Sequence, residues 1–328
     1  MRGRTVAGFM ILVASAVSSS AANLYDATSK RIMPGSGQAY YYNVGIDNGG
    51  QAGHILFDDV TVPSSYPIAV FQVTKITVGV SRVANAPSVQ ITPYYSQMLP
   101  DSVRYGGAYD GAFYDPLFVQ TFASPALLPV NGGGFVDGAA VTFGDGVSPL
   151  FSVVGQPAGP TTAYRSFAIG LKFSTTDNKN GWTIAQQSSN LDVLWDHLTD
   201  SSFEEFTYGQ DSSGPILGTQ YLKVEGSLVP GMPADANFDG RVDARDLGVL
   251  AMHWFQPGNF SMGDFNFDGV VDLRDLVILA QNWQAGVPAF SESLESLGLP
   301  STSVPEPAAV AWILPFVMLI PRRAYFSN

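Results

Sequence analysis

The sequence predicts a mainly β protein, an antiparallel β-sandwich with jelly-roll-like spacing, followed by a small α-helical module. Three observations support this prediction. The 328 residues include 34 Gly and 22 Pro, which favours many turns between short strands. Several segments before residue 230 alternate apolar and polar residues with the period of two of a half-buried strand. After residue 233, a loop followed by an amphipathic helical pattern occurs twice, 29 residues apart.

The composition limits the classes of function. The formal net charge is −12, and a nucleic-acid-binding protein needs Lys and Arg to neutralise phosphates, so we expect no nucleic-acid partner. The chain has no cysteine, which excludes disulfides, thiolate metal sites and cysteine nucleophiles. Hydrophobic residues make up 46% of the chain, enough for a sizeable core. The length is sufficient for about two domains.

Residues 1–22 are predicted to be a secretory signal peptide. Arg2 and Arg4 are basic, residues 6–17 are largely apolar, and Ser20, Ala21 and Ala22 supply the small residues of a cleavage site. The alternative is an N-terminal membrane anchor, but the apolar run is shorter than the roughly 20 residues that a spanning helix needs. We therefore expect the chain to be exported.

Residues 23–230 are predicted to form the β-sandwich, because three segments alternate cleanly and no long amphipathic helical pattern is present. In "TTDNKNGW", Asn180-Gly181 predicts a tight turn, with Trp182 at the start of the returning strand. The segment "VPGMPA" is the predicted linker to the next module. The residues expected to face the core are Ile76, Val78, Val80, Phe167, Ile169, Leu171, Phe173, Leu222, Val224 and Leu228.

The sandwich region offers few groups for catalysis. It lacks the serine-hydrolase, zinc-protease and P-loop spacings. Neighbouring residues of a strand point to opposite faces, so neither Glu204-Glu205 nor Asp58-Asp59 would act as a pair on one substrate. A solvated strand end is the expected setting of Asp58-Asp59, with a structural Ca²⁺ site as the alternative. The sequence thus favours a non-enzymatic protein and leaves enzymatic activity open.

The segment "RYGGAYDGAFYDP" combines aromatic residues with Gly and Asp, which is typical of a loop. Exposed aromatic rings could stack on the sugars of an extracellular polysaccharide. The alternative, which we favour, is that they pack together as the private core of the loop. The candidate stacking residues are Tyr105, Tyr109, Phe113 and Tyr114.

The duplicated loops, "DANFDGRVDARD" and "DFNFDGVVDLRD", have the spacing of EF-hand-type calcium loops. Positions 1, 3, 5, 9 and 12 carry Asp or Asn, position 6 is Gly, and position 7 supplies only a backbone carbonyl. A set of hard oxygen ligands without thiolate or imidazole favours Ca²⁺ over Zn²⁺ or Cu²⁺, so we expect two Ca²⁺ ions. The expected ligands are Asp235, Asn237, Asp239, Arg241, Asp243 and Asp246 in loop one, and Asp264, Asn266, Asp268, Val270, Asp272 and Asp275 in loop two.

A helical pattern follows each loop. Leu247, Leu250, Ala251 and Trp254 recur as Leu276, Leu279, Ala280 and Trp283, with the spacing of one helix face. We expect the two units to bury these faces against each other. A module of this size has a marginal core, and bound metal is the expected source of additional stability.

Residues 233–285 resemble a type I dockerin, through the duplicated pattern of calcium loop and helix. The resemblance implies a cohesin-like or other surface protein as partner, bound through the helices. Dockerins of cellulosomes often carry a Ser-Thr-like pair at loop positions 10 and 11. Here these positions hold Ala244-Arg245 and Leu273-Arg274, which favours an acidic or unrelated partner, or no partner at all.

Residues 286–303 are a predicted linker, and residues 304–328 resemble the PEP-CTERM sorting signal. The matching residues are Pro305, Glu306 and Pro307, the apolar run 308–320, and then Arg322 and Arg323. The resemblance implies an exosortase-type membrane protease that processes the tail, in hosts that typically make extracellular polysaccharide. The run is short for a permanent anchor, so we expect transient membrane contact; an ordinary tail anchor is the alternative.

Two functions remain open at this level. The first is a non-enzymatic exported cell-surface or extracellular-matrix protein with a calcium-stabilised dockerin-like interaction module. The second is a carbohydrate-active protein, either a glycan-binding module or a weak glycoside hydrolase. Two carboxylates about 5 to 9 Å apart in a cleft would favour hydrolysis, and an aromatic platform without them would favour glycan binding.

Overall fold

The computed structural model describes most of the chain between the two terminal segments. The described residues are 22–43, 54–100, 114–157, 164–175, 179–186, 193–197, 203–207, 210–211, 214–215 and 218–287.

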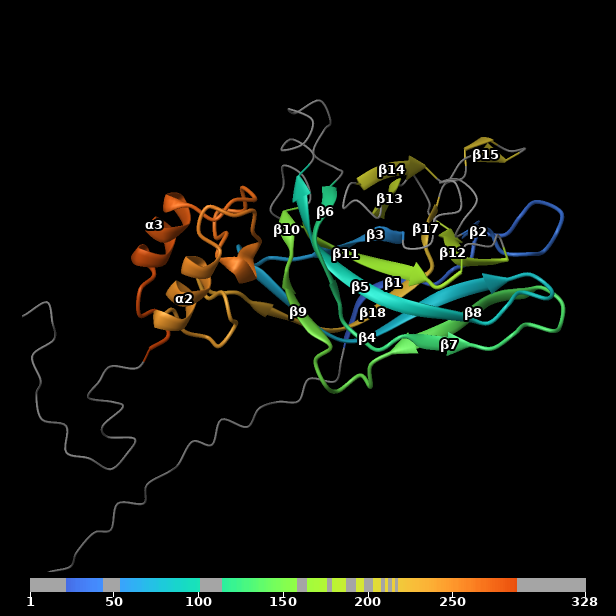
Figure 1. Ribbon diagram of the computed structural model, residues 1–328, viewed down its shortest axis with the longest axis horizontal. Coiled ribbons are helices and arrows are strands. Elements are labelled where there is room, and N and C mark those ends of the chain that lie inside the picture. The colour runs from blue at the N-terminus through green and yellow to red at the C-terminus, as the bar shows by residue number, and fades with distance from the viewer. Residues whose placement is uncertain are drawn as a thin grey trace, which may run out of the picture.

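The described chain is mainly β, as predicted, and two antiparallel eight-stranded sheets dominate it (Figure 1). Sheet one has the order β1 (Ala22–Ala27), β18 (Leu222–Pro230), β4 (Ala69–Arg82), β12 (Asn180–Gln186) and β17 (Gly218–Gln220), with β2 (Tyr41–Asn43) on β12 and with β8 (Val136–Phe143) and β9 (Phe151–Val154) on β4. Sheet two has the order β14 (Phe203–Thr207), β13 (Val193–His197), β3 (Ile55–Pro63), β11 (Tyr164–Phe173), β5 (Val89–Pro100) and β6 (Tyr114–Thr121), with β10 (Gln156–Pro157) on β11 and β7 (Ala126–Leu128) on β5. A separate pair joins β15 (Gln210–Asp211) to β16 (Gly214–Pro215).

One hydrophobic core unites residues of both sheets, and we call this part of the chain the two-sheet domain. The predicted period-two faces are confirmed: the residues of β4, β11 and β18 that were expected to face the core are buried, except Leu228, which is partly buried. Trp182 is fully buried, and its indole N–H donates to the carbonyl oxygen of Tyr221 at 3.0 Å. Alternation along single strands therefore identified which side chains fill the core.

The predicted hairpin at Asn180-Gly181 is wrong. Both residues belong to β12, which pairs with β4 in sheet one, whereas β11 pairs with β3 and β5 in sheet two. The chain therefore crosses from one sheet to the other between residues 173 and 180. Trp182 pairs with Val80 of β4, which places its indole in the core. β12 begins at Asn180, two residues before the strand start that the turn pattern indicated.

Asp58 and Asp59 do not lie at a solvated strand end, which corrects the sequence-based expectation. They lie in β3, between β13 and β11, and Asp58 is only 1% exposed. One carboxylate oxygen of Asp58 accepts a hydrogen bond from Thr219 Oγ1 at 2.8 Å, so Asp58 links sheet two to sheet one. Asp59 instead accepts from Thr61 Oγ1 at 2.8 Å, and burial raises the pKa of Asp59.

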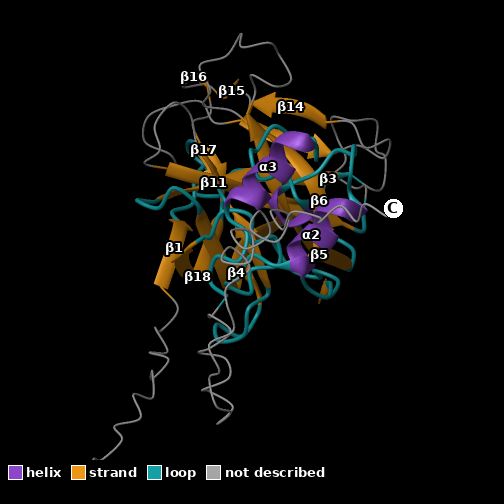
Figure 2. Cartoon of the chain, turned by 90° about the vertical axis from the view of Figure 1, so that its left-hand side faces the viewer, coloured by secondary structure: helices purple, strands orange, loops and turns teal. Residues whose placement is uncertain are grey.

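Two α-helices occur in the described chain, α2 (Ala244–Met252) and α3 (Leu273–Gln281), with the short 3-10 helix η1 (Phe260–Met262) between them. They lie together at one end of the two sheets, in front of the strands in Figure 2. Neither helix is long and apolar enough to cross a membrane, and no other described helix is. We call residues 233–287 the module.

A second hydrophobic core lies between the module and the sheets. Val70 of β4 and Val154 of β9 belong to it, together with Phe260 and the buried residues of both loops. Leu250 and Leu279 are buried as predicted, but Leu247 is 37% exposed and Trp283 is 42% exposed. The expectation that the Leu and Trp faces bury each other therefore holds only in part, because phenylalanine rings occupy the middle of the module.

Candidate metal centre

The two loops of the module share a set of internal hydrogen bonds. In loop one, the carboxylate of Asp235 accepts from the backbone N–H groups of Asp239 at 3.1 Å and Gly240 at 2.9 Å. In loop two, Asp264 accepts from Asp268 and Gly269 at the same two distances. A side chain at position 1 therefore holds the backbone of positions 5 and 6 in both loops, as expected for one structural unit present twice.

Glycine at position 6 is required by the backbone. Gly240 has a φ of +79° and Gly269 a φ of +86°, in the left-handed region that favours glycine. Position 4 is also left-handed, with a φ of 59° at Phe238 and 63° at Phe267. A positive φ at a bulky residue is uncommon, so its occurrence at the same place in both loops indicates a shared constraint.

The aspartate at position 12 connects the end of each loop to its start. Asp246 accepts from the N–H of Ala236 and of Asp243, both at 2.9 Å, and Asp275 accepts from Phe265 and Asp272, both at 2.8 Å. Asp243 and Asp272 are the N-caps of α2 and α3, so each pair forms a capping box. These caps were not predicted from the sequence, although the D-x-x-D spacing at the start of each helix indicates them.

Carboxylates are crowded and buried at the centre of both loops. Asp235, Asp246, Asp264 and Asp275 are each at most 4% exposed. Burial, followed by the charges of Asp275 and Asp268, raises the pKa of Asp264 to about 7. Within the described chain, neither Asp235 nor Asp264 has a Lys or Arg at ion-pair distance. These groups are unfavourable when ionised, unless a cation compensates them.

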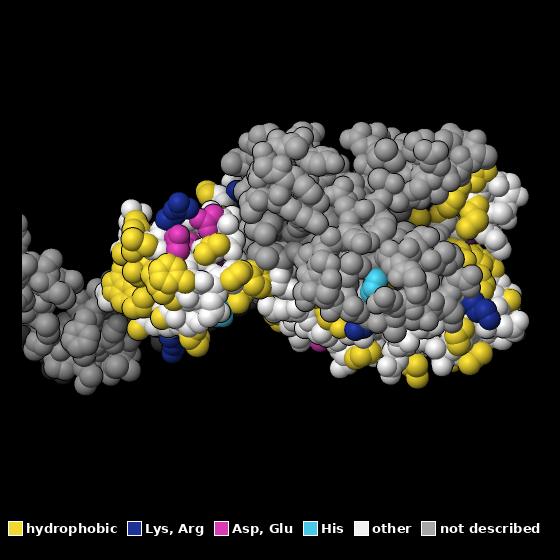
Figure 3. Space-filling view, turned by 45° about the horizontal axis from the view of Figure 1, so that its top comes forward, with side chains coloured by type: hydrophobic (Ala, Val, Ile, Leu, Met, Phe, Trp, Pro, Cys, Tyr) yellow, Lys and Arg dark blue, Asp and Glu magenta, His cyan; other side chains and the backbone are white. Residues whose placement is uncertain are grey.

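An arginine contacts each loop from outside. Arg245 Nη1 lies 3.1 Å from Asp239 Oδ2, and Arg274 Nη1 lies 2.9 Å from Asp268 Oδ2. Both arginines are about three-quarters exposed, and the charged side chains of the module lie among hydrophobic ones on its surface (Figure 3). The sequence analysis treated the arginines only as partner-facing residues, whereas each one partly neutralises the aspartate at position 5.

The side chains of the loops offer oxygen atoms to a metal ion. Among the described residues, no group of three or more His, Cys, Asp or Glu side chains is arranged so that it could hold a metal ion. The position 3 oxygens are nevertheless directed into the loops, since Asn237 Oδ1 and Asn266 Oδ1 accept from the N–H at position 5 at 2.9 and 2.8 Å. An all-oxygen set with buried, mutually repelling carboxylates fits a hard divalent cation.

Position 4 connects both loops to the two-sheet domain. The rings of Phe238 and Phe267 stack on Phe260, with centroids 6.0 and 5.6 Å away and interplanar angles of 7° and 23°. Phe265 meets the same ring edge-on at 5.3 Å. The backbone N–H of Phe260 donates to Oε1 of Gln97, in β5, at 3.2 Å. Phe260 therefore links both loops to β5.

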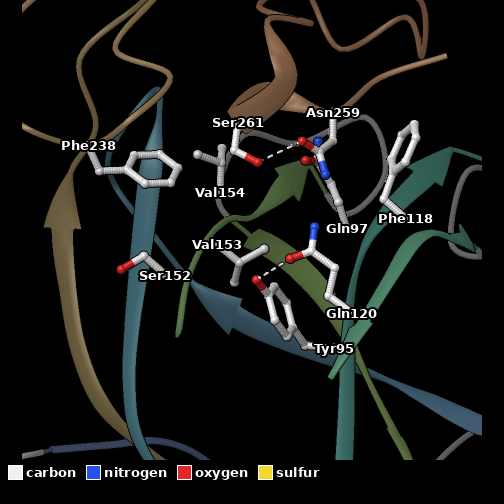
Figure 4. A pocket seen from close by; sticks show the side chains of 10 residues that line it. All are labelled: Tyr95, Gln97, Phe118, Gln120, Ser152, Val153, Val154, Phe238, Asn259 and Ser261. Carbon is white, nitrogen blue, oxygen red and sulfur yellow. Dashed lines mark hydrogen bonds between the residues drawn. The ribbon is translucent and has the colours of Figure 1, made fainter. Parts of the chain in front are cut away.

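A pocket lies at this joint between module and sheets (Figure 4). Its cavity volume is only about 20 Å³, and it opens to solvent. Its ten lining residues contain amides, hydroxyls and aromatic or aliphatic groups, and none of them is charged. They are Tyr95, Gln97, Phe118, Gln120, Ser152, Val153, Val154, Phe238, Asn259 and Ser261.

Other predicted site residues lie outside the described part of the chain. They are the sorting residues Pro305, Glu306, Pro307, Arg322 and Arg323 and the aromatic residues Tyr105, Tyr109 and Phe113. Tyr114 is the first residue of β6, but its side chain is also outside the description. The chain matches no protein-family model, no curated protein and no solved structure.

Proposed function

We propose that this chain is a non-enzymatic, exported cell-surface or extracellular-matrix protein. In this proposal a jelly-roll-like β-sandwich is joined to a dockerin-like module that binds two Ca²⁺ ions. The observation that carries the proposal is the repetition of one loop geometry, hydrogen bond by hydrogen bond, in two segments 29 residues apart. Independent acidic surface loops would have no reason to share left-handed residues at positions 4 and 6.

The carboxylates and amides of the loops would hold the ions. Asp235, Asn237 and Asp239 supply oxygens in loop one, and the residues at equivalent positions do so in loop two. A bound Ca²⁺ supplies the positive charge that compensates buried aspartates such as Asp264, whose raised pKa reflects burial and neighbouring negative charge. The protein's own part is to keep the loop backbone in place, through the N–H groups that donate to the aspartate at position 1 and through the capping box between positions 9 and 12.

Calcium stoichiometry tests the metal claim directly. Isothermal titration of the full mature chain should give two Ca²⁺ ions per chain. Asp239→Ala and Asp268→Ala should each lower the count to one, and the double variant should bind none. Mg²⁺ should substitute poorly, because it prefers tight octahedral geometry and retains its water.

Asp145→Ala provides the matched control. Asp145 is also an aspartate whose carboxylate accepts backbone N–H bonds, from Val147 at 2.8 Å and Ser148 at 2.7 Å, but it lies in an exposed turn of the two-sheet domain. Its replacement should leave the count at two. A chain that binds no Ca²⁺ at millimolar concentration, or whose loop variants still bind two ions, would contradict the proposal.

The exposed side of the module supports a role in protein contact. Leu273 is 63% exposed and Val277 is 46% exposed on α3, beside the exposed Arg274. A cohesin-like or other surface protein with apolar and acidic groups is the partner that this composition suits. Binding of purified candidate domains to the wild-type chain, and its loss in Leu273→Asp, would test this partner.

Export and sorting rest on the two terminal segments. The mature protein should begin near Asn23, and replacement of Pro305, Glu306 and Pro307 should leave it in the inner membrane of the host. N-terminal sequencing that recovers Thr5, or normal surface delivery of the tail variant, would remove this part of the proposal. An exosortase-type protease is the processing enzyme that the tail resemblance implies.

A carbohydrate-active function is the second candidate, and the pocket at the joint favours its glycan-binding form. The ten residues that line the pocket include no carboxylate. Glycoside hydrolysis typically needs two carboxyl groups on either side of the bond that is cut. This pocket therefore suits recognition of a sugar rather than its hydrolysis.

A further inference from the structure

We propose that the pocket at the joint binds one neutral sugar residue of an extracellular polysaccharide. This inference rests on the proposed function for the protein's extracellular location, but the site itself is defined by residues of both structural parts. The proposal identifies a ligand class for the two-sheet domain, for which the sequence indicated only a loop of aromatic residues.

The pocket exists only while the module is docked. β5 contributes Tyr95 and Gln97, β6 contributes Phe118 and Gln120, and β9 contributes residues 152–154. The opposite wall comes from Phe238 in loop one and from Asn259 and Ser261 at η1. Figure 4 shows these side chains around one hollow, with the strands below and the module above. The site is therefore composite, and neither part forms it alone.

Hydrogen-bond donors remain uncommitted in this hollow. The backbone N–H of Phe260 donates to the side-chain oxygen of Gln97. The side-chain nitrogen of the same amide, Nε2, is therefore left to donate to a ligand. The Tyr95 hydroxyl donates to the side-chain oxygen of Gln120 at 2.8 Å. The Ser261 hydroxyl donates to the side-chain oxygen of Asn259, also at 2.8 Å. In this arrangement the three amide nitrogens have no hydrogen-bond partner among the described residues.

Apolar groups complete the lining. Phe118, Phe238 and Val153 lie beside the amides, so the pocket combines apolar surface with directed polar groups. A sugar ring has the matching character, since its C–H groups form apolar faces and its hydroxyls lie around the edge. Ligand sites of this kind are typically apolar with a few placed polar groups that fix orientation.

The backbone at Phe118 gives an independent reason to expect a site here. Its φ is +58°, although it is a bulky residue within β6. The β5–β6 register shifts at this place, which is where an extra residue redirects side chains. Strained residues and bulges concentrate at functional sites, so the outlier and the unpaired amides point to the same pocket.

Charge selects a neutral ligand over a charged one. None of the ten lining residues is cationic, and the whole chain carries a formal net charge of −12. A polyuronate would therefore be repelled at long range and would find no ion-pair partner in the pocket. The hollow is shallow, with a cavity volume of about 20 Å³, and it opens to solvent, so it would contact the edge of one ring of a chain and could not enclose an oligosaccharide.

The test is binding of defined saccharides to the full mature chain in saturating Ca²⁺. The probes are neutral oligosaccharides of glucose, galactose, mannose and N-acetylglucosamine, with alginate as the charged comparison, and the readouts are saturation-transfer NMR and calorimetry. Gln120→Glu keeps the shape of the side chain and removes its N–H donors. We expect it to weaken binding of the preferred neutral probe at least about tenfold.

Gln90→Glu is the control, because Gln90 is an exposed residue of the same strand β5 and lies outside the pocket, and it adds the same charge. It should leave affinity unchanged. The inference is overturned if the wild-type chain binds none of the neutral probes, if it binds alginate alone, or if Gln120→Glu behaves like Gln90→Glu. A chain that binds two Ca²⁺ ions and reaches the surface but binds no saccharide would remove only this inference. The proposed function would then stand, whereas a chain that binds a neutral saccharide but no Ca²⁺ would contradict the calcium claim and leave the pocket.

Discussion

Truncation of Phe260 should uncouple the module from the two-sheet domain. Phe260 is 1% exposed, contacts three other phenylalanine rings, and its N–H is bonded to Gln97. Removal of a buried phenylalanine side chain costs about 3–5 kcal/mol when the surroundings collapse only partly. We expect Phe260→Ala to lower the free energy of unfolding of the full chain by this amount in saturating Ca²⁺.

Urea unfolding followed by tryptophan fluorescence and by far-ultraviolet circular dichroism is the assay. The helical signal reports on α2 and α3. Trp254 and Trp283 of the module are replaced by phenylalanine in every chain compared, so the fluorescence signal excludes the module and includes Trp182 in the core of the two-sheet domain. In the wild-type chain both signals should change at one urea concentration, because the second core is shared between the two parts. In Phe260→Ala the helical signal should change first.

Phe255→Ala is the matched control. Phe255 is a phenylalanine of the same module, but it is 72% exposed. Its removal should change the free energy of unfolding by less than about 1 kcal/mol and leave the two signals coincident. The reasoning would be refuted if Phe260→Ala cost no more than Phe255→Ala, or if the two signals were already separate in the wild-type chain.

Three further predictions concern single residues. Gly144→Ala should destabilise the chain by more than about 2 kcal/mol, since its Cβ would lie 2.3 Å from a backbone carbonyl oxygen; Gly146→Ala, also at positive φ but with nothing nearer than 3.9 Å, should cost only about 1 kcal/mol in the same urea assay. Burial raises the pKa of Asp59, so the folded chain keeps this proton to higher pH than the unfolded chain does, and stability is lost as pH rises above the ordinary range of an aspartate. Asp59→Asn should therefore stabilise the chain by an amount that grows as pH rises above about 4, and a gain independent of pH would contradict this. Arg274→Ala should tighten calcium binding about two- to fivefold in titration calorimetry, because it frees Asp268 from an exposed ion pair worth about 0.2–1 kcal/mol; unchanged or weaker binding would contradict it.

Local patterns were sufficient for the parts of the fold that depend on neighbouring residues. Alternation along "RSFAIGLKFS" identified Phe167 and Ile169 as core residues, because the side-chain period of a strand is fixed by its backbone. The repeat at 29 residues likewise predicted that the two loops would fold alike, and Gly240 and Gly269 have the left-handed backbone expected for position 6. A short-range pattern contains this information because each constraint acts within one strand or one loop.

Pairings between distant segments were decided by the tertiary structure alone. Asn180-Gly181 has the composition of a hairpin turn, yet β11 and β12 belong to different sheets, because the burial of Trp182 against β4 determines where β12 lies. Asp58 was expected in solvent and instead links the two sheets through Thr219, 161 residues later in the chain.

The joint that creates the pocket is the strongest case. Phe260 bonds to Gln97 across 163 residues, and no periodicity or spacing in the sequence relates the two positions. The sequence by itself determined which side chains would be buried within a strand and which loops would share one geometry. Which of those surfaces meet depends on packing between elements far apart in the chain, and only the folded structure brings the amides of β5 and β6 to the loops of the module.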